Sequence, residues 1–299
     1  MNFFMMVHSV SSYICLKNLI ASEYKPGIVV SHKNYEREKL NKDFYLPLEK
    51  LCAKNKIKLI ESDSPSELKG EIKNYELGIC IGYMKILRKD FFEIPKYGIF
   101  NLHCGKLPDY RGRAPISRTI MNGDSDLIIT LHKIDEGVDS GDIAIEEKIK
   151  ITYSDDVNTL YKKFSENTHK VIIKLLRDIN KGVLKLKRQR KTKRKAYTSL
   201  TEQECKVDWN KDSIKVYNHI RALKNPYPCS HFIYKNQKFL TNDVKLSKLK
   251  SIHKPGIIEK RTAKMLLVST KTNSVYIGDI SINGKKVNPK NFIIGERFN

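Results

Sequence analysis

The sequence has few of the features that mark membrane-spanning, exported or zinc-binding chains. Its 299 residues contain no run of about 18 consecutive apolar residues, so we expect no transmembrane helix and no membrane partner. The opening segment MNFFMMVHSV has neither a basic leader nor a small-residue cleavage site, which favours a first strand over a signal peptide. The six cysteines are scattered and form no Cys-x-x-Cys pair, which argues against zinc. Free thiols in a reducing compartment, the cytoplasm, are therefore expected.

Acidic residues are also scarce relative to basic ones. The chain has 56 Lys and Arg against 33 Asp and Glu, a formal net charge of +23. Such a charge favours anionic partners, which include nucleotides, phosphorylated cofactors and RNA. A general compositional bias towards Lys, Asn and Ile would produce the same excess, and the composition leaves both explanations open.

The first half of the chain alternates apolar runs with helical patterns. Helical spacing is seen in SSYICLKNLIASE and PLEKLCAKNKIK. The alternation predicts βαβ units and a Rossmann-like, mostly parallel sheet in an α/β domain. The expected strands of this sheet are FFMMVHSV, PGIVVSH, LIES, ELGICIGY and KYGIFNLHC.

The second half predicts a change of architecture. Two further strands, LIITLHKI and GDIAIEEKIKI, precede a long amphipathic helix that Gly182 ends. We expect residues 1–184 to form the catalytic domain and the basic tract within 185–203 to be a linker. Residues 204–299 contain short apolar runs between Gly, Pro and Asn turns, a pattern that predicts a small β-barrel, OB-like, domain.

The segment NLHCGKLPDYRGRAP places Asn101 and His103 two residues apart at the end of a predicted strand. Residues i and i+2 share one face of a strand, so both side chains would project to the ligand edge of the sheet. Asp139, in the loop DEGVDSGD, could reach the same edge and orient or charge the imidazole. An amide, a base and a carboxylate suit acyl transfer to an amine. Cys104 would face the other way, and His132 is interpreted as a packing residue or as one that contacts the catalytic residues from behind.

The ordered set NLHCGKLPDYRGRAP and TLHKIDEGVDSGDI resembles the 10-formyltetrahydrofolate-dependent formyltransferase family. The resemblance implies a one-carbon transferase in which Asn101, His103 and Asp139 are catalytic. It implies 10-formyltetrahydrofolate as co-substrate and no metal. It also implies cofactor contacts at Lys85, Ile86, Leu87, Arg113, Asp135, Glu136, Gly137 and Val138, and substrate contacts at Tyr110 and Arg111.

The resemblance extends through KVDWNKDSIKVYNHIRALKNPYP and therefore covers most of the chain. Two departures stand out. The family's first strand runs into a turn that contains glycine, whereas MMVHSVSSY has none. Cys-Gly-Lys precedes Leu-Pro where Pro-Ser-Leu is usual, which puts one polar cofactor contact in doubt.

Two members of the family fit this chain, and they differ in the amine that accepts the formyl group. YRGRAP, NPYP and the short segment after PGIVVSH favour a nucleotide-linked amino sugar, and we expect that acceptor. The alternative is initiator methionyl-tRNA, for which KLKRQRKTKRK would supply phosphate contacts. A formyltetrahydrofolate hydrolase and a non-catalytic RNA-binding protein are less favoured alternatives. The sugar, its nucleotide and the oligomeric state, for which a homodimer is one option, are not fixed by the sequence.

Overall fold

The computed structural model describes residues 1–33, 46–225 and 227–299, and its chain forms two compact units. The first unit comprises Met1–Gly112, Asp126–Lys150 and Tyr161–Tyr197, and the second comprises Arg113–Ser125, Ile151–Leu160 and Thr198–Asn299. The segment after PGIVVSH that bears on the choice of acceptor falls within 34–45 and lies outside the described residues.

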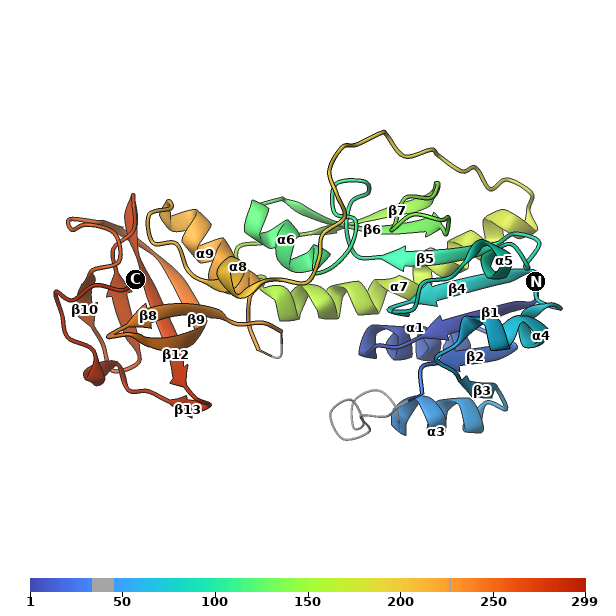
Figure 1. Ribbon diagram of the computed structural model, residues 1–299, viewed down its shortest axis with the longest axis horizontal. Coiled ribbons are helices and arrows are strands. Elements are labelled where there is room, and N and C mark those ends of the chain that lie inside the picture. Colours follow the sequence, from blue (N-terminus) through green and yellow to red (C-terminus); the bar gives the residue numbers. More distant parts are fainter. Residues whose placement is uncertain (34–45, 226) are drawn as a thin grey trace. The chain divides into compact units, whose positions relative to one another are not determined.

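The first unit is built on a seven-stranded sheet in the order β3-β2-β1-β4-β5-β6-β7 (Figure 1). Strands β1 to β5 are parallel, whereas β6 and β7 are antiparallel to their neighbours. Every residue of β1 is buried, as expected for a parallel strand covered on both faces. The predicted Rossmann-like sheet is thus confirmed. The strands are β1 (Phe3–Val7), β2 (Ile28–Ser31), β3 (Lys58–Glu61), β4 (Leu77–Ile81), β5 (Ile99–His103), β6 (Asp126–Lys133) and β7 (Ile143–Lys150).

The connection from β1 to helix α1 contains no glycine, and a capping interaction starts the helix there. The Ser9 side chain accepts a hydrogen bond from the Ser12 backbone N–H, and the Ser12 side chain accepts one from the Ser9 N–H. This reciprocal cap starts the helix directly after β1. Apart from the helix at residues 115–122, which belongs to the second unit, the helical elements up to the long helix are α1 (Val10–Ala21), α3 (Leu46–Lys54), a 3-10 turn (Pro65–Leu68), α4 (Lys69–Ile72), α5 (Lys89–Phe92) and α7 (Val157–Asn180).

The second unit contains an antiparallel sheet in the order β10-β11-β12-β9-β8, with β13 paired to β12. Residues near the end of the chain cover both outer strands. Ile258 of β10 donates to Glu296 O at 2.9 Å, and Ile233 of β8 exchanges two bonds of 2.9 Å with Asn299. The sheet is thereby closed in the manner predicted for this domain. Its elements are α6 (Pro115–Asn122), α8 (Glu202–Cys205), α9 (Ser213–Ala222), β8 (Ser230–Tyr234), β9 (Gln237–Lys250), β10 (Ile258–Arg261), β11 (Met265–Val268), β12 (Asn273–Ile282), β13 (Lys285–Lys286) and a 3-10 turn (Pro289–Asn291).

The core of the second unit is rich in aromatic rings. Trp209 is 3% exposed and packs against Phe232 and Phe298, at ring-centroid distances of 6.2 and 5.7 Å. Both of these rings belong to the same unit as Trp209. No helix within the described ranges has the length and hydrophobicity needed to span a bilayer.

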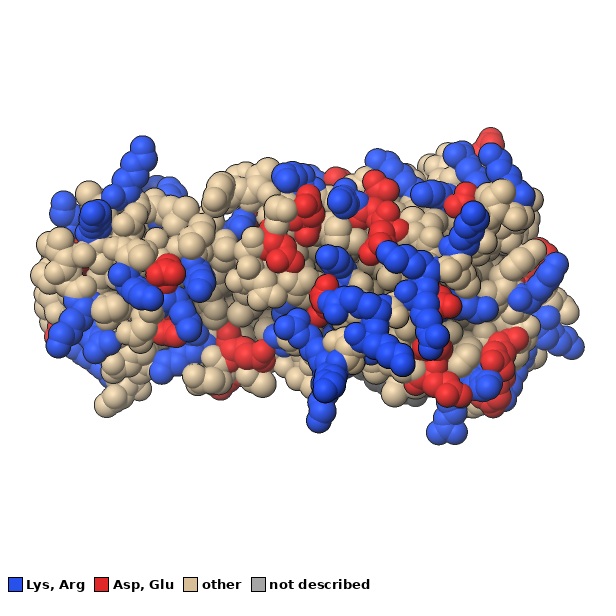
Figure 2. Space-filling model, turned by 90° about the horizontal axis from the view of Figure 1, so that it is seen from above, with Lys and Arg blue, Asp and Glu red and all other residues tan. Residues whose placement is uncertain are grey.

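Residues 185–197, which we call the strap, follow α7 as an extended segment of the first unit. Lys187 and Ile143 exchange two backbone hydrogen bonds of 2.8 Å, and Tyr197 N donates to Arg111 O at 2.8 Å. In Figure 1 the strap runs along the top of the first unit, and basic side chains predominate on the face seen from above in Figure 2. The part of the predicted linker up to Tyr197 is therefore hydrogen-bonded to the first unit.

Candidate active site

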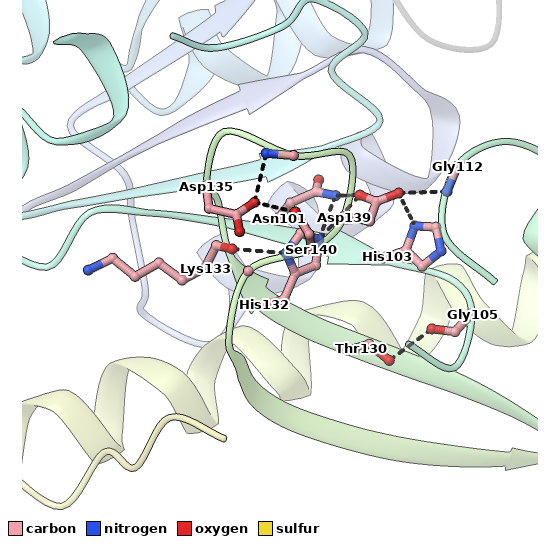
Figure 3. A network of polar contacts seen from close by, with 12 residues as sticks. Asn101, His103, Gly105, Gly112, Thr130, His132, Lys133, Asp135, Asp139 and Ser140 are labelled. Carbon is pink, nitrogen blue, oxygen red and sulfur yellow. Dashed lines mark hydrogen bonds and ion pairs between the residues drawn. The ribbon is translucent and has the colours of Figure 1, made fainter. Parts of the chain in front are cut away.

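Asn101 and His103 project from β5 towards one carboxylate, that of Asp139 in the turn after β6 (Figure 3). Asn101 Nδ2 donates to Asp139 Oδ1 at 3.2 Å, and His103 Nδ1 lies 3.6 Å from Asp139 Oδ2. The alternation of side chains along the strand explains why residues 101 and 103 reach the same point. The structure thus brings together the three residues that the sequence singled out.

His132 completes this cluster from the neighbouring strand β6. The sheet register pairs Asn101 with His132, whose side chain is 3% exposed. The Nδ1 atom of His132 lies 3.0 Å from Lys133 O, so this nitrogen must carry the proton and donate. Its Nε2 atom lies 3.3 Å from Asn101 Nδ2 and 3.3 Å from Asp139 Oδ1. The Asn101 amide and the Asp139 carboxylate therefore meet at this nitrogen.

The loop after β5 fixes the imidazole of His103. His103 Nε2 lies 2.7 Å from the carbonyl oxygen of Tyr110, so Nε2–H donates to that oxygen. In the neutral ring this leaves the lone pair of Nδ1 on the side of Asp139. The Gly112 N–H donates to Asp139 Oδ2 at 2.8 Å. One loop therefore orients both the imidazole and the carboxylate.

Burial and hydrogen bonding set the charges of this pair. Burial lowers the pKa of His103 below its ordinary value, although the Asp139 carboxylate opposes that shift. Burial alone would raise the pKa of Asp139, but His103, His132 and the Gly112 N–H together bring it well below its ordinary value. At neutral pH the site accordingly holds an ionised carboxylate beside a neutral imidazole, which can act as a base.

The turn that carries Asp139 has an unusual backbone. Asp139 has φ +49°, in the left-handed region that residues other than glycine rarely adopt. Asp135 Oδ1 accepts from Gly137 N at 3.1 Å and from Ser140 Oγ at 2.7 Å, which braces the turn from inside. A Cβ at Gly141 would lie 1.9 Å from Lys133 O, so only glycine fits there.

A cavity of about 220 Å³ opens beside Asn101, His132 and Asp139. Its exposed rim combines the apolar side chains of Ile86 and Val138, 83% and 55% exposed, with the charged side chains of Lys85 and Glu136. A concave site that combines apolar surface with a few polar groups is typical of small-molecule binding. The lining residues are Cys80, Tyr83, Lys85, Ile86, Leu87, Asn101, His132, Ile134, Asp135, Glu136, Gly137, Val138 and Asp139, which include seven of the expected cofactor contacts.

Three other expected contacts are not among these lining residues. The Tyr110 side chain is 5% exposed and stacks on Tyr197, so Tyr110 reaches the cluster through its carbonyl oxygen. Arg111 Nη2 donates to Arg194 O at 2.7 Å. Arg113 belongs to the second unit and donates to Ser199 Oγ at 3.2 Å. These arginines are engaged with the chain itself in this structure.

Sequence reasoning did not pair His132 with Asn101, and it missed the contact that Gln189 makes with the turn. The pairing of His132 with Asn101 follows from the strand register and could have been found from the alignment of β5 with β6. Gln189 of the strap donates to Asp139 O and Gly141 O. These residues precede Gln189 by 50 and 48 positions in the sequence, and no local sequence pattern predicts a contact over that separation.

Cys104 directly follows His103 in the sequence. Burial raises the pKa of the Cys104 thiol to about 12, so this residue is a poor nucleophile. Within the described part of the chain, no group of three or more His, Cys, Asp or Glu side chains is arranged to hold a metal ion.

Comparison with known proteins identifies the family. The formyl transferase model matches residues 16–176, and the formyl transferase C-terminal domain model matches residues 199–297. The chain is 32% identical to the methionyl-tRNA formyltransferase of Caldicellulosiruptor saccharolyticus, over 84% of this chain and 83% of that protein. It is also 32% identical to the methionyl-tRNA formyltransferase of Prochlorococcus marinus, over 96% and 93% of the two chains.

Among solved structures, the chain resembles WlaRD, a sugar 3N-formyl transferase, with a TM-score of 0.71 at 20% identity over 95% of this chain and 98% of that one. A second similar fold is the N-formyltransferase from Helicobacter canadensis, with a TM-score of 0.69 at 18% identity over 93% and 99% of the two chains. Identities this low show a shared fold. On the strength of the family models and the sequence relatives, the chain belongs to the formyl transferase family.

Proposed function

We propose that this formyltransferase moves the formyl group of 10-formyltetrahydrofolate to a primary amine. The observation that carries the proposal is the convergence of Asn101, His103 and Asp139 on one point beside a cavity. Acyl transfer to an amine requires a group that stabilises an oxyanion and a group that accepts a proton, and this cluster holds both.

The proposed reaction begins when the neutral amine attacks the formyl carbon. The formyl oxygen becomes an oxyanion, to which an N–H of the Asn101 amide turns from its bond of 3.2 Å with Asp139. His103 takes the amine proton on Nδ1, and the resulting imidazolium lies between the Asp139 carboxylate and the Tyr110 carbonyl. The proton then passes to N10 of the folate as the bond between the formyl carbon and N10 breaks.

We assign the folate ring system to the cavity beside the cluster. Its exposed rim residues Ile86 and Val138 offer an apolar surface for a flat aromatic ring. Lys85, Leu87 and the turn 135–138 supply the remaining contacts that we propose for the donor. The WlaRD structure was solved with 5-N-formyl-THF, and the similarly folded HypX of Aquifex aeolicus was solved with tetrahydrofolic acid, which supports a folate in this fold.

For the acceptor, we propose methionyl-tRNA in place of the amino sugar that the loop motifs favoured. The relatives at 32% identity are methionyl-tRNA formyltransferases. The strap adds a physical reason, because eight of the eleven residues from 185 to 195 are Lys or Arg and all eight are exposed. A row of exposed cations beside the catalytic turn suits a polyphosphate backbone.

A nucleotide-linked amino sugar is the second candidate. The motifs YRGRAP and NPYP favour it, and WlaRD was crystallised in the presence of dTDP. A nucleoside diphosphate presents two phosphates, so it needs few cations and would leave most of the strap unused. The two acceptors therefore differ in how many cations of the strap they would contact.

The deciding experiment offers the purified protein 10-formyltetrahydrofolate with either charged initiator tRNA or a panel of nucleotide-linked amino sugars. Product formation is followed by mass spectrometry, with His103→Gln as the inactive control. Turnover with tRNA alone supports the first candidate, and turnover with a sugar alone overturns it in favour of the second. Formyl transfer to neither acceptor by wild-type protein would contradict the proposed function.

A further inference from the structure

The strap carries one side chain that reaches the catalytic turn. Gln189 Nε2 donates to Asp139 O at 2.9 Å and to Gly141 O at 2.7 Å. Two carbonyl oxygens can only be satisfied by the NH2 end of the amide, which fixes the orientation of the Gln189 side chain. Its Oε1 atom is buried and has no hydrogen-bond partner within the described ranges, so Nε2 supplies the side chain's hydrogen bonds.

These two bonds brace the turn where its backbone is least favourable. Asp139 has φ +49°, and such a conformation persists only where the surroundings hold it. Asp135 braces the turn from inside through Gly137 N and Ser140 Oγ. Gln189 braces it from outside, on the carbonyls of residues 139 and 141. A shift of this backbone would move the Asp139 carboxylate away from His103 and Asn101.

The strap is itself fixed on both sides of Gln189. On one side, Lys187 exchanges two backbone bonds of 2.8 Å with Ile143 at the start of β7. On the other, Arg190 pairs with Asp109, and Tyr197 N donates to Arg111 O at 2.8 Å. The amide of Gln189 is thus held in place before substrate arrives, as precise positioning of a catalytic group requires.

We propose that Gln189 is a positioning residue, which holds the turn 139–141 so that the Asp139 carboxylate faces His103 and Asn101. This inference rests on the proposed function, in which Asp139 stabilises the protonated His103. Gln189 acts through the turn and does not touch the reacting atoms. The basic strap consequently belongs to the catalytic machinery in addition to any role in binding an acceptor.

Three substitutions separate the donor function of Gln189 from its size. Gln189→Met keeps the length and removes the donor, Gln189→Glu turns a carboxylate towards two carbonyl oxygens, and Gln189→Lys keeps a donor. We expect kcat to fall about tenfold to a hundredfold for Met and further for Glu, since small misplacements of a catalytic group have effects of this size. The KM for the folate should change less than kcat, and Lys should recover part of the loss.

The matched control is Gln237→Glu, which makes the same change of charge at an exposed glutamine of β9. It should leave kcat and KM at wild-type values. If Gln189→Met and Gln189→Glu also retained wild-type kcat, the proposal would be overturned.

A second readout does not depend on turnover. The titration of His103, followed by NMR of its imidazole, should shift in Gln189→Met because the Asp139 carboxylate no longer holds its place, and the amides of residues 139–141 should exchange faster with solvent. An unchanged titration together with unchanged exchange would refute the proposal. A shifted titration in a protein whose wild type has no formyltransferase activity would support the positioning role and reject the proposed function.

Discussion

His103 and Asp139 face each other across 3.6 Å, between Nδ1 and Oδ2, while the opposite nitrogen of the imidazole donates to Tyr110 O at 2.7 Å. Both ring nitrogens thus face oxygen acceptors, of which a neutral imidazole can satisfy only one by donation. Protonation of the ring would satisfy both, so the site is prepared for the charge that proton transfer from an amine would create.

Loss of either member of this pair should slow the chemical step. We expect Asp139→Asn to reduce kcat about a hundredfold or more, because an amide cannot stabilise the imidazolium and must also reorganise its contacts with Gly112 N. The comparison is made by steady-state kinetics, with circular dichroism to establish that the fold is intact. A kcat within about threefold of wild type would argue against the proton-transfer role.

The pH dependence follows from the lowered pKa of His103. The neutral ring is the active base, so kcat/KM should fall on the acid side with a midpoint below about 6.5, the ordinary value for histidine. A midpoint above that value would contradict the assignment. In His103→Gln this limb should disappear from the residual activity.

Stability should depend on pH in the same direction. In the unfolded chain this histidine takes up a proton near pH 6.5, about its ordinary pKa, whereas folded His103 resists protonation. Its contribution to the free energy of unfolding is therefore present above that pH and is lost as the pH falls. The lowered pKa of Asp139 adds a second loss as the pH falls below about 4, its usual range. Urea denaturation of wild type, His103→Gln and Asp139→Asn across acid pH separates the two contributions. His103→Gln should lose the part of the acid dependence that begins at about pH 6.5, and Asp139→Asn should lose the part that begins at about pH 4, the ordinary values of the two groups.

Gly112 should be intolerant of substitution. It has φ +94°, and a Cβ there would lie 2.2 Å from Tyr197 O. Gly112→Ala should cost about 2 kcal/mol or more of stability, since both strain and a backbone clash are introduced. Gly182→Ala is the matched control, because Gly182 has φ +67° and no atom within 4 Å of the added Cβ, so it should lose about 1 kcal/mol. Equal losses in urea denaturation would contradict the role given to the close approach of Tyr197.

The dependence of KM on salt concentration should distinguish the two acceptors. If methionyl-tRNA is the acceptor, its KM should rise steeply with ionic strength, and the triple variant Lys191→Gln, Lys193→Gln, Lys195→Gln should reduce that slope. All three lysines are exposed on the strap. A KM that is independent of these lysines at low salt would contradict polyanion binding by this segment.

Local patterns allowed much of the fold and part of the site to be predicted. Apolar runs and their spacing indicated the parallel strands, and the Asn-x-His spacing placed Asn101 and His103 on one face of β5. Contacts between distant segments were not predictable in this way. Neither the bond from Gly112 to Asp139 nor that from Gln189 has a periodic signature, because each depends on how loops close in three dimensions. The strap has the composition of a solvated linker, yet its backbone is hydrogen-bonded to Ile143 and Arg111.

The closure of the second sheet has a consequence for the behaviour of the chain at high concentration. An uncovered outer strand offers its free N–H and C=O groups to any similar strand, and intermolecular β-pairing begins there. In this chain Ile233 of β8 and Ile258 of β10 already bond to residues 295–299. Removal of those five residues would uncover β10 and the end of β8 at Ile233, and it would take Phe298 out of the core. The shortened chain should aggregate even though its catalytic cluster is untouched.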